Sequence, residues 1–288
     1  MPYLMEIAFD NDHRLKRRYY LFVYKGIRFK LIQDIQRKWA DHLITILPEG
    51  NEVEREKVFS VASEFISALG WQNRAIVAVW ESGGCGWRKE LPLSRAMPSF
   101  RTFPRIPFGG SIIGCDIDII PKIENEEQRV ALTLYREARA SNNDYLSFLF
   151  FWQVLETGGT NAEKYVNNIW KKQPDGLKRV AKDIESLQLQ SRLLGKYFRD
   201  ECRDAIAHIR RKPGKKKLEM DKTKERHRIS NDTRIIENVA EYYIENHLKL
   251  NKQLYLKRKG KRGFPTYVSS EECSVGAWYF PAYKSGQN

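Results

Sequence analysis

The chain has few cysteines, and the ones it has are far apart. Its 288 residues include only Cys85, Cys115, Cys202 and Cys273. None belongs to a CxxC pair and none has a histidine nearby at ligand spacing, so neither a zinc knuckle nor a disulfide framework is predicted. We therefore expect free thiols in a reducing compartment, with no metal and no other cofactor.

The chain also lacks a long apolar run. Its longest candidate, YLSFLFFWQVL, is shorter than the roughly 20 residues that span a bilayer, so we predict a buried core helix. The first residues, MPYLMEIAFDND, reach charged side chains too early for a secretory signal. The glycine-rich segment Gly83–Trp87 is not followed by GK[ST], which argues against a phosphate-binding P-loop. These absences predict a cytoplasmic protein with no membrane partner.

Acidic residues do not balance the basic ones, and the excess is concentrated. The formal net charge of the chain is +14. Residues 186–262 alone contain 22 Lys and Arg against 10 Asp and Glu, a net charge of +12. A basic block of this kind is typical of a nucleic-acid contact, so we expect an anionic partner and favour RNA.

Residues 1–123 mix strand and helix signals and predict a small α+β domain. Two β-rich runs, Tyr19–Tyr24 and Ile27–Ile32, flank Lys25-Gly26 as in a hairpin. Residues 52–69 have the spacing of an amphipathic helix that Gly70 ends. Further strands are predicted at HLITIL, RAIVAVW and SIIGCDIDII, with a long loop before the last. We expect a sensing or targeting role, which the sequence does not specify.

From residue 124 to residue 250 the pattern is helical and predicts an α-helical bundle. The expected helices are Glu124–Ala140, Tyr145–Thr157, Ala162–Lys171, Leu177–Ile184, Leu187–Ile209 and Thr233–Leu250. Their single long connection, Arg210–Ser230, is strongly basic and is expected to be mobile. The aromatic tail, residues 251–288, is expected to pack back onto the two domains.

Three chemically useful side chains lie near the end of the long predicted helix. Asp204 and His208 are four residues apart, so the carboxylate can hold one imidazole nitrogen. Arg203 and His208 are five apart, which places them roughly 140° from each other around an ideal helix. Either the helix loosens in its last turn, or a second copy of the chain completes the site. We expect a homodimer.

These side chains suit the cleavage of RNA through its own 2′-hydroxyl. The imidazole of His208 can accept or deliver a proton, and the guanidinium of Arg203 can stabilise a phosphorane without a metal. A positive stripe along and beyond the helix is predicted to guide the RNA backbone. It comprises Arg192, Lys196, Arg199, Arg210, Arg211, Lys212, Lys215, Lys216 and Lys217.

The sequence R-D-A-I-A-H, from Arg203 to His208, resembles the R-x4-H motif of the HEPN superfamily. The segment LYREARASNNDYLSFLFFWQVLE also looks like the opening helical pair of that superfamily, particularly its MauJ-like and phage-defence-associated members. The resemblance covers about residues 124–250. It implies an all-α dimeric bundle with metal-independent endoribonuclease activity, in which Arg203 and His208 are catalytic and Asp204 replaces a more common asparagine. It also implies a toxin or antiviral role.

Plainer interpretations of the same residues stay open. His208 can instead interact with the carbonyl end of its own helix, and Arg203 with Asp204 can form an ordinary surface pair. A non-catalytic module that binds RNA or a nucleotide and recruits a partner is the alternative function. A pure dimerisation scaffold is the third possibility.

Overall fold

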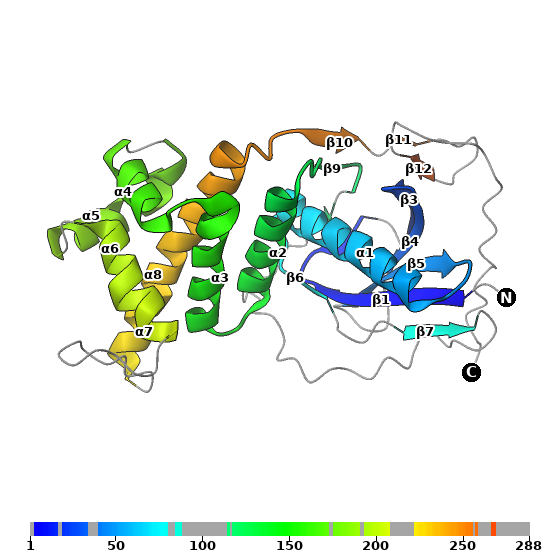
Figure 1. The fold of residues 1–288 in the computed structure, drawn as a ribbon, viewed down its shortest axis with the longest axis horizontal. Coiled ribbons are helices and arrows are strands. Elements are labelled where there is room, and N and C mark those ends of the chain that lie inside the picture. Colours follow the sequence, from blue (N-terminus) through cyan, green and yellow to red (C-terminus); the bar gives the residue numbers. More distant parts are fainter. Residues whose placement is uncertain are drawn as a thin grey trace.

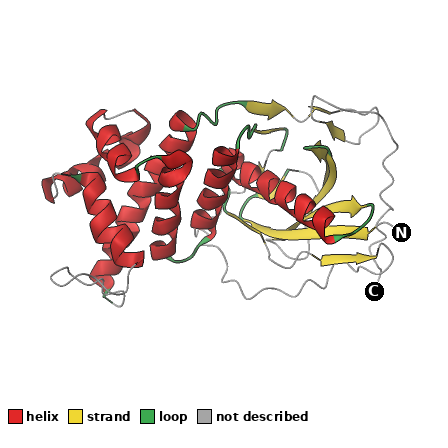
Figure 2. Ribbon diagram, viewed as in Figure 1, coloured by secondary structure: helices red, strands yellow, loops and turns green. Residues whose placement is uncertain are grey.

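The computed structural model places a sheet-rich half and a helical half side by side (Figure 1, Figure 2). It describes residues 3–16, 19–33, 40–79, 84–87, 114–115, 117–172, 175–190, 193–207, 222–255, 257–258 and 266–268. The prediction of an α+β region followed by a helical region is confirmed. Among the described residues, no helix combines the length and the apolar character that crossing a bilayer requires.

The sheet is mostly antiparallel, with strand order β11-β12-β3-β4-β5-β1-β6 and with β7 also paired to β1. Its strands are β1 Tyr3–Asn11, β3 Tyr19–Tyr24, β4 Ile27–Gln33, β5 Ala40–Leu47, β6 Val77–Val79, β7 Gly84–Trp87, β11 Lys257–Arg258 and β12 Thr266–Val268. Strand β1 was not predicted from the sequence, although it pairs with β5 on one side and with β6 and β7 on the other. Residues Gly84–Trp87 belong to the predicted long loop, but in the structure they form β7.

The predicted hairpin between β3 and β4 is confirmed. Lys25 and Gly26 both have positive φ, 48° and 74°, as a two-residue type I′ turn requires. Glu64, which is buried, accepts hydrogen bonds from the Tyr24 hydroxyl at 2.6 Å and from Lys25 Nζ at 2.8 Å. The carboxylate therefore fixes the hairpin turn to the neighbouring helix.

The long helix α1, Glu52–Asn73, lies across one face of the sheet (Figure 2). Its Phe65 ring packs 4.5 Å from the ring of Phe22. The expectation that Gly70 ends this helix is wrong, because the helix continues to Asn73. Gly70 is instead a site of close approach, since a Cβ there would lie 2.6 Å from Cγ2 of Val77.

Replacing Gly70 with alanine should lower the free energy of unfolding. Overpacking costs roughly 1–3 kcal/mol, which outweighs a gain in helix propensity of up to about 1 kcal/mol. Urea unfolding of Gly70→Ala should therefore show a loss of about 1 kcal/mol. In a Val77→Ala background the same change should stabilise the protein, because the clash is gone. An equal loss in both backgrounds would contradict this explanation.

The helical half is a bundle around the nearly all-apolar α3, which packs against α2 and α8. Its helices are α2 Glu126–Ala140, α3 Asp144–Glu156, α4 Ala162–Lys172, α5 Ala181–Gln190, α6 Leu194–Tyr197, α7 Asp204–Ala207 and α8 Thr223–Tyr242. Two 3-10 turns, Thr157–Gly159 and Asp175–Val180, and two π-helical turns, Phe198–Arg203 and Tyr243–His247, complete it.

Several predicted boundaries in the bundle are wrong. The helix expected over Leu177–Ile184 is a 3-10 turn followed by α5, which continues to Gln190. The continuous helix expected over residues 187–209 is divided, because α5 ends at Gln190 and α6 begins at Leu194. Helix α8 begins at Thr223, ten residues before the predicted start, and so includes the end of the connection that we expected to be mobile. The buried Ile229 extends the apolar side of α8 towards its N-terminus, despite the many charged residues around it.

The two halves are joined at helices α1 and α2. Arg136 of α2 is buried and donates hydrogen bonds from Nη1 to the Ser63 carbonyl at 3.0 Å and to Ser67 Oγ at 2.9 Å, both on α1. The short strands β9 Ile119–Pro121 and β10 Gln253–Tyr255 pair antiparallel, so the chain enters and leaves the bundle at the same place. A further pair, β2 Arg14–Leu15 with β8 Gly114–Cys115, forms a separate parallel two-stranded sheet.

The part of the chain expected to pack back as a tail begins with β10 and continues into β11 and β12. Strand β12 lies parallel to β3 and therefore adds to the edge of the main sheet. The aromatic residues Trp278, Tyr279, Phe280 and Tyr283 lie outside the described residues.

Candidate functional site

The candidate site lies at the end of a π-helical turn, Phe198–Arg203, that links α6 to α7. The backbone N–H of Asp204 donates to the carbonyl of Arg199, five residues earlier, which is the hydrogen bond of a π-helix. Phe198 and Cys202 are buried in the core, whereas Arg199 and Arg203 are partly exposed. The helix thus widens one turn earlier than the sequence analysis expected.

Arg203 and Asp204 contact each other. Nη1 of Arg203 lies 2.9 Å from Oδ1 of Asp204, and the two side chains are 37% and 34% exposed. This is the surface pair that the sequence analysis kept as one of its plainer interpretations. His208, the third residue of the predicted site, lies outside the described residues.

One of the two described residues of the predicted positive stripe is neutralised by carboxylates. Arg199 forms ion pairs with Glu163 of α4 and with Asp200, whose Oδ1 lies 2.9 Å from Arg199 Nε. Lys196 is exposed on α6. The remaining predicted contacts, Arg192, Arg210, Arg211, Lys212, Lys215, Lys216 and Lys217, lie outside the described residues.

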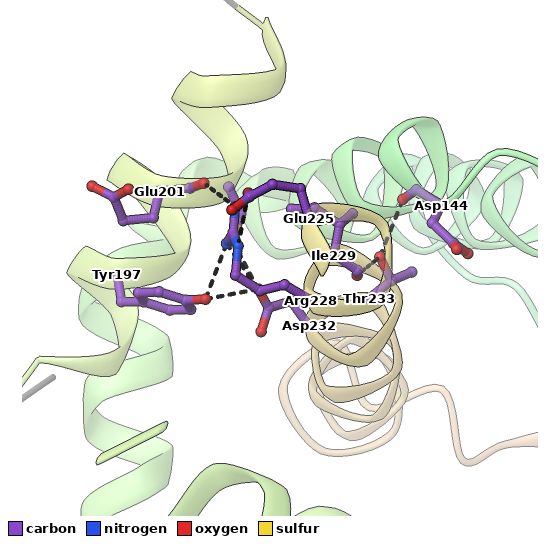
Figure 3. A network of polar contacts seen from close by, with 9 residues as sticks. Asp144, Tyr197, Glu201, Glu225, Arg228, Ile229, Asp232 and Thr233 are labelled. Carbon is purple, nitrogen blue, oxygen red and sulfur yellow. Dashed lines mark hydrogen bonds and ion pairs between the residues drawn. The ribbon is translucent and has the colours of Figure 1, made fainter. Parts of the chain in front are cut away.

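Sequence reasoning missed a buried network around Arg228 on α8 (Figure 3). Its guanidinium donates from Nη1 to Tyr197 Oη at 3.1 Å and to Asp232 Oδ2 at 3.2 Å. From Nη2 it donates to Glu225 Oε2 at 2.9 Å and to the carbonyl of Glu201 at 3.4 Å. One side chain of α8 therefore holds both α6 and the π-helical turn.

Asp232 is the buried acceptor of this network. It accepts hydrogen bonds from Tyr197 Oη at 2.8 Å and from Cys202 Sγ at 3.3 Å, in addition to that from Arg228. Burial raises the pKa of Asp232, while the hydrogen bonds and the charge of Arg228 act in the opposite direction. Burial, together with the nearby carboxylate, raises the pKa of the Cys202 thiol well above its ordinary value. Cys202 therefore stays a protonated donor and is unsuited to act as a nucleophile.

A glycine allows the same segment to approach α4. A Cβ on Gly195 would collide with the backbone carbonyl of Glu163, and the N–H of Gly195 donates to Asn167 Oδ1 at 2.8 Å. The segment that carries Arg199 and Arg203 is therefore fixed to α4 at its start and to α8 further along. Among the described residues, no group of three or more His, Cys, Asp and Glu is arranged to hold a metal ion.

The comparisons with known proteins bear on this half of the chain. A family model described as "Methylamine utilization protein MauJ" matches residues 131–245, from within α2 to the π-helical turn after α8. The match includes Arg203, Asp204 and Arg228 and leaves out the sheet. No curated protein and no solved structure matches the chain.

Replacing Arg228 with methionine should strongly destabilise the protein, because Asp232 would keep a buried charge without its cation. We expect a loss of about 3 kcal/mol in the free energy of unfolding, measured by urea denaturation. Adding Asp232→Asn should recover part of that loss, since no buried charge then remains.

The matched control is Arg234→Met on the same helix. Arg234 and its partner Asp183 are 57% and 36% exposed, so this pair should contribute less than about 1 kcal/mol. Equal losses for Arg228→Met and Arg234→Met would show that the network does not hold the site.

Proposed function

We propose that this protein is a metal-independent endoribonuclease of the HEPN superfamily. The observation that carries the proposal is the position of Arg203, which is partly exposed at the end of an anchored helix within the segment that the MauJ family model matches. In the sequence His208 follows five residues later, which completes the R-x4-H motif. The substrate is RNA, because the reaction needs a 2′-hydroxyl.

In the proposed reaction, His208 takes the proton of the 2′-hydroxyl, and the 2′-oxygen then forms a bond to phosphorus. The bond from phosphorus to the 5′-oxygen breaks, and the leaving oxygen receives a proton from the His208 of a second chain. Arg203 stabilises the negative charge that develops on the non-bridging oxygens. The products are a 2′,3′-cyclic phosphate and a 5′-hydroxyl, and the active form is a homodimer.

The surroundings of Arg203 support this role. The two contacts of its helix segment, through Gly195 to α4 and through Arg228 to the Glu201 carbonyl, fix the backbone from which the Arg203 side chain extends. Such positioning is what electrostatic catalysis requires. The pair with Asp204 is about one-third exposed, and pairs of this kind contribute little free energy. A phosphate can therefore compete with Asp204 for the guanidinium.

The role of the predicted basic residues is to guide RNA. Lys196 is exposed on α6, in the turn that precedes the π-helical segment, and forms no ion pair within the described residues, so its positive charge is available to RNA. Arg199 is already paired with two carboxylates, so we assign it a smaller share of RNA binding. We further propose that the nuclease serves as a toxin or antiviral effector in the cytoplasm, and that the sheet-rich half senses or targets.

An RNA-cleavage assay with and without EDTA tests the proposal. Wild-type protein should cleave RNA in EDTA and leave cyclic phosphate ends that mass spectrometry detects. His208→Ala should reduce the rate at least about 100-fold through loss of proton transfer. Arg203→Ala should reduce it about 100- to 1,000-fold through loss of charge stabilisation.

The control for these variants is His247→Ala, which removes a histidine in the π-helical turn after α8 and should cleave at the wild-type rate. Cleavage that EDTA abolishes, or a His208→Ala variant as active as wild type, would overturn the proposal. A strictly monomeric protein at the assay concentration would remove the proposed division of acid and base between two chains.

Replacing Asp204 with asparagine should increase cleavage. The asparagine keeps a polar side chain beside Arg203 but removes the ion pair, which at this exposure is worth up to about 1 kcal/mol. The expected gain in kcat/KM is about two- to fivefold. A lower rate in Asp204→Asn would instead indicate that the carboxylate is itself needed, for example to orient His208.

A second function, a non-catalytic module that binds RNA, is favoured by one observation. Both described arginines of the site are paired with carboxylates, which lowers the positive potential available to a transition state. In that case Arg203→Ala should weaken RNA retention and reduce its salt dependence by about one counterion, and no cleavage product should form. The same gel assay distinguishes the two functions.

A further inference from the structure

A second candidate site lies on the other side of the bundle, where the end of α1 meets α2 and the end of α8. It is a cavity of about 180 Å³. Its lining residues are Trp71, Gln72, Arg74, Tyr135, Arg139, Glu241 and Glu245. Glu245 is 17 residues from Arg228 along α8 and the turn that follows, a separation of roughly 25 Å at helical rise, so the cavity is distinct from the proposed ribonuclease site.

Two aromatic rings form a rigid wall of the cavity. Trp71 and Tyr135 pack edge to face with ring centroids 5.0 Å apart. The Tyr135 hydroxyl donates to Glu241 Oε1 at 2.5 Å. This wall therefore joins α1, α2 and α8, and it offers an apolar surface beside charged groups.

An arginine and a glutamate deeper in the cavity are already held in place. Arg139 donates from Nη1 to the carbonyl of Arg74 at 3.1 Å, and its Nε lies 3.5 Å from Glu237 Oε1. Glu241 accepts the hydrogen bond from Tyr135. The cavity therefore has one positive group, Arg139, and one negative group, Glu241, in fixed positions.

At the mouth, a second arginine and a second glutamate have no such contacts. The exposed side chains of Arg74 and Glu245 form no hydrogen bond or ion pair within the described part of the chain. The exposed amide of Gln72 also lines the cavity. One cation, one anion and one amide are thus available to a ligand.

The backbone at Arg74 is also unusual for its residue type. Arg74 caps α1 with φ 52°, a left-handed conformation in which glycine is strongly favoured and other residues cost about 1 kcal/mol or more. Backbone preference therefore does not explain an arginine here, although Lys25 and Lys249 adopt the same left-handed conformation.

We propose that this cavity binds a small zwitterion of the α-amino acid type. The ligand carboxylate pairs with Arg74, and Arg139 lies deeper in the cavity on the same side. The ligand ammonium pairs with Glu245, and Glu241 lies deeper on its side. The side chain of the ligand packs against Trp71. The lining has two arginines and two glutamates, and Glu237 already pairs with one of these arginines, so a purely anionic ligand is disfavoured.

The size of the cavity supports a small ligand. Pockets that take drug-sized molecules measure roughly 300–1,000 Å³, well above the volume found here. A nucleotide would therefore extend far outside, whereas a single amino acid fits. Because α1 belongs to the sheet-rich half and α2 and α8 to the bundle, the bound ligand contacts both halves.

The test uses the full chain and each of the 20 common L-amino acids at 10 mM, screened by thermal unfolding and followed by calorimetric titration of any that stabilises. We expect at least one to bind. Arg74→Gln and Glu245→Gln should each weaken its Kd about tenfold, as expected for a hydrogen bond to a charged group. Lys57→Gln and Glu56→Gln, exposed positions earlier on α1, should leave the Kd unchanged.

Two derivatives of the bound amino acid test the zwitterion directly. Its N-acetyl form loses the contact with Glu245, and its carboxamide loses the contact with Arg74, so both should bind about tenfold more weakly to wild type. In Arg74→Gln the carboxamide and the free acid should bind equally. The inference is overturned if no amino acid binds at 10 mM, if neither cavity variant changes the Kd, or if the controls weaken it as much. Since neither variant touches Arg203, failure here leaves the ribonuclease proposal unaffected.

Discussion

The ion pair between the partly exposed Arg228 and the buried Asp232 determines where the candidate site lies. The carboxylate of Asp232 is buried and gathers donors from Tyr197, Cys202 and Arg228. Because a buried carboxylate is costly without partners, each donor is drawn to a fixed place around it. Two of these donors belong to the segment that carries Arg203. The geometry of an exposed arginine therefore depends on a charge that lies inside the bundle.

The arginines of this segment differ in how firmly they are held, and that difference separates their roles. Arg199 pairs with Glu163 on another helix and with Asp200, so releasing it breaks two contacts and one of them joins two helices. Within the described part of the chain, Arg203 pairs with the adjacent Asp204 alone, at a partly exposed position. A phosphate thus displaces one weak contact at Arg203, whereas at Arg199 it must replace two. In the proposed ribonuclease, Arg203 is therefore the catalytic group and Arg199 mainly a structural one.

Sequence patterns predicted those elements whose own residues determine them. The β3–β4 hairpin follows from a local turn, and α3 follows from an apolar run after the cap at Asn143. Strand β1 has apolar residues at alternate positions, Met5, Ile7 and Phe9, and all three are buried. The strand was not predicted because these first residues were considered only as a possible secretory signal. The start of α8 was missed for a related reason. A basic stretch is easily interpreted as a loop between helices. Only the helical spacing of the buried Ile229 with the apolar residues of the following turns shows that it is the start of α8.

The candidate site was predictable only in part, because its adjacent residues can be found in the sequence and its distant contacts cannot. Arg203 and Asp204 are neighbours in the chain, but nothing local relates Cys202 to Asp232. The spacing of Glu225, Arg228 and Asp232 at three and four residues is a helical charge pattern, and it would have indicated the network had α8 been extended. The same distinction applies to the cavity beside α1. At the ribonuclease site and at the cavity, side chains that are already paired, such as Arg139, fix the shape of the site. Side chains with weak contacts, or with none among the described residues, such as Arg74, are the ones proposed to bind the ligand.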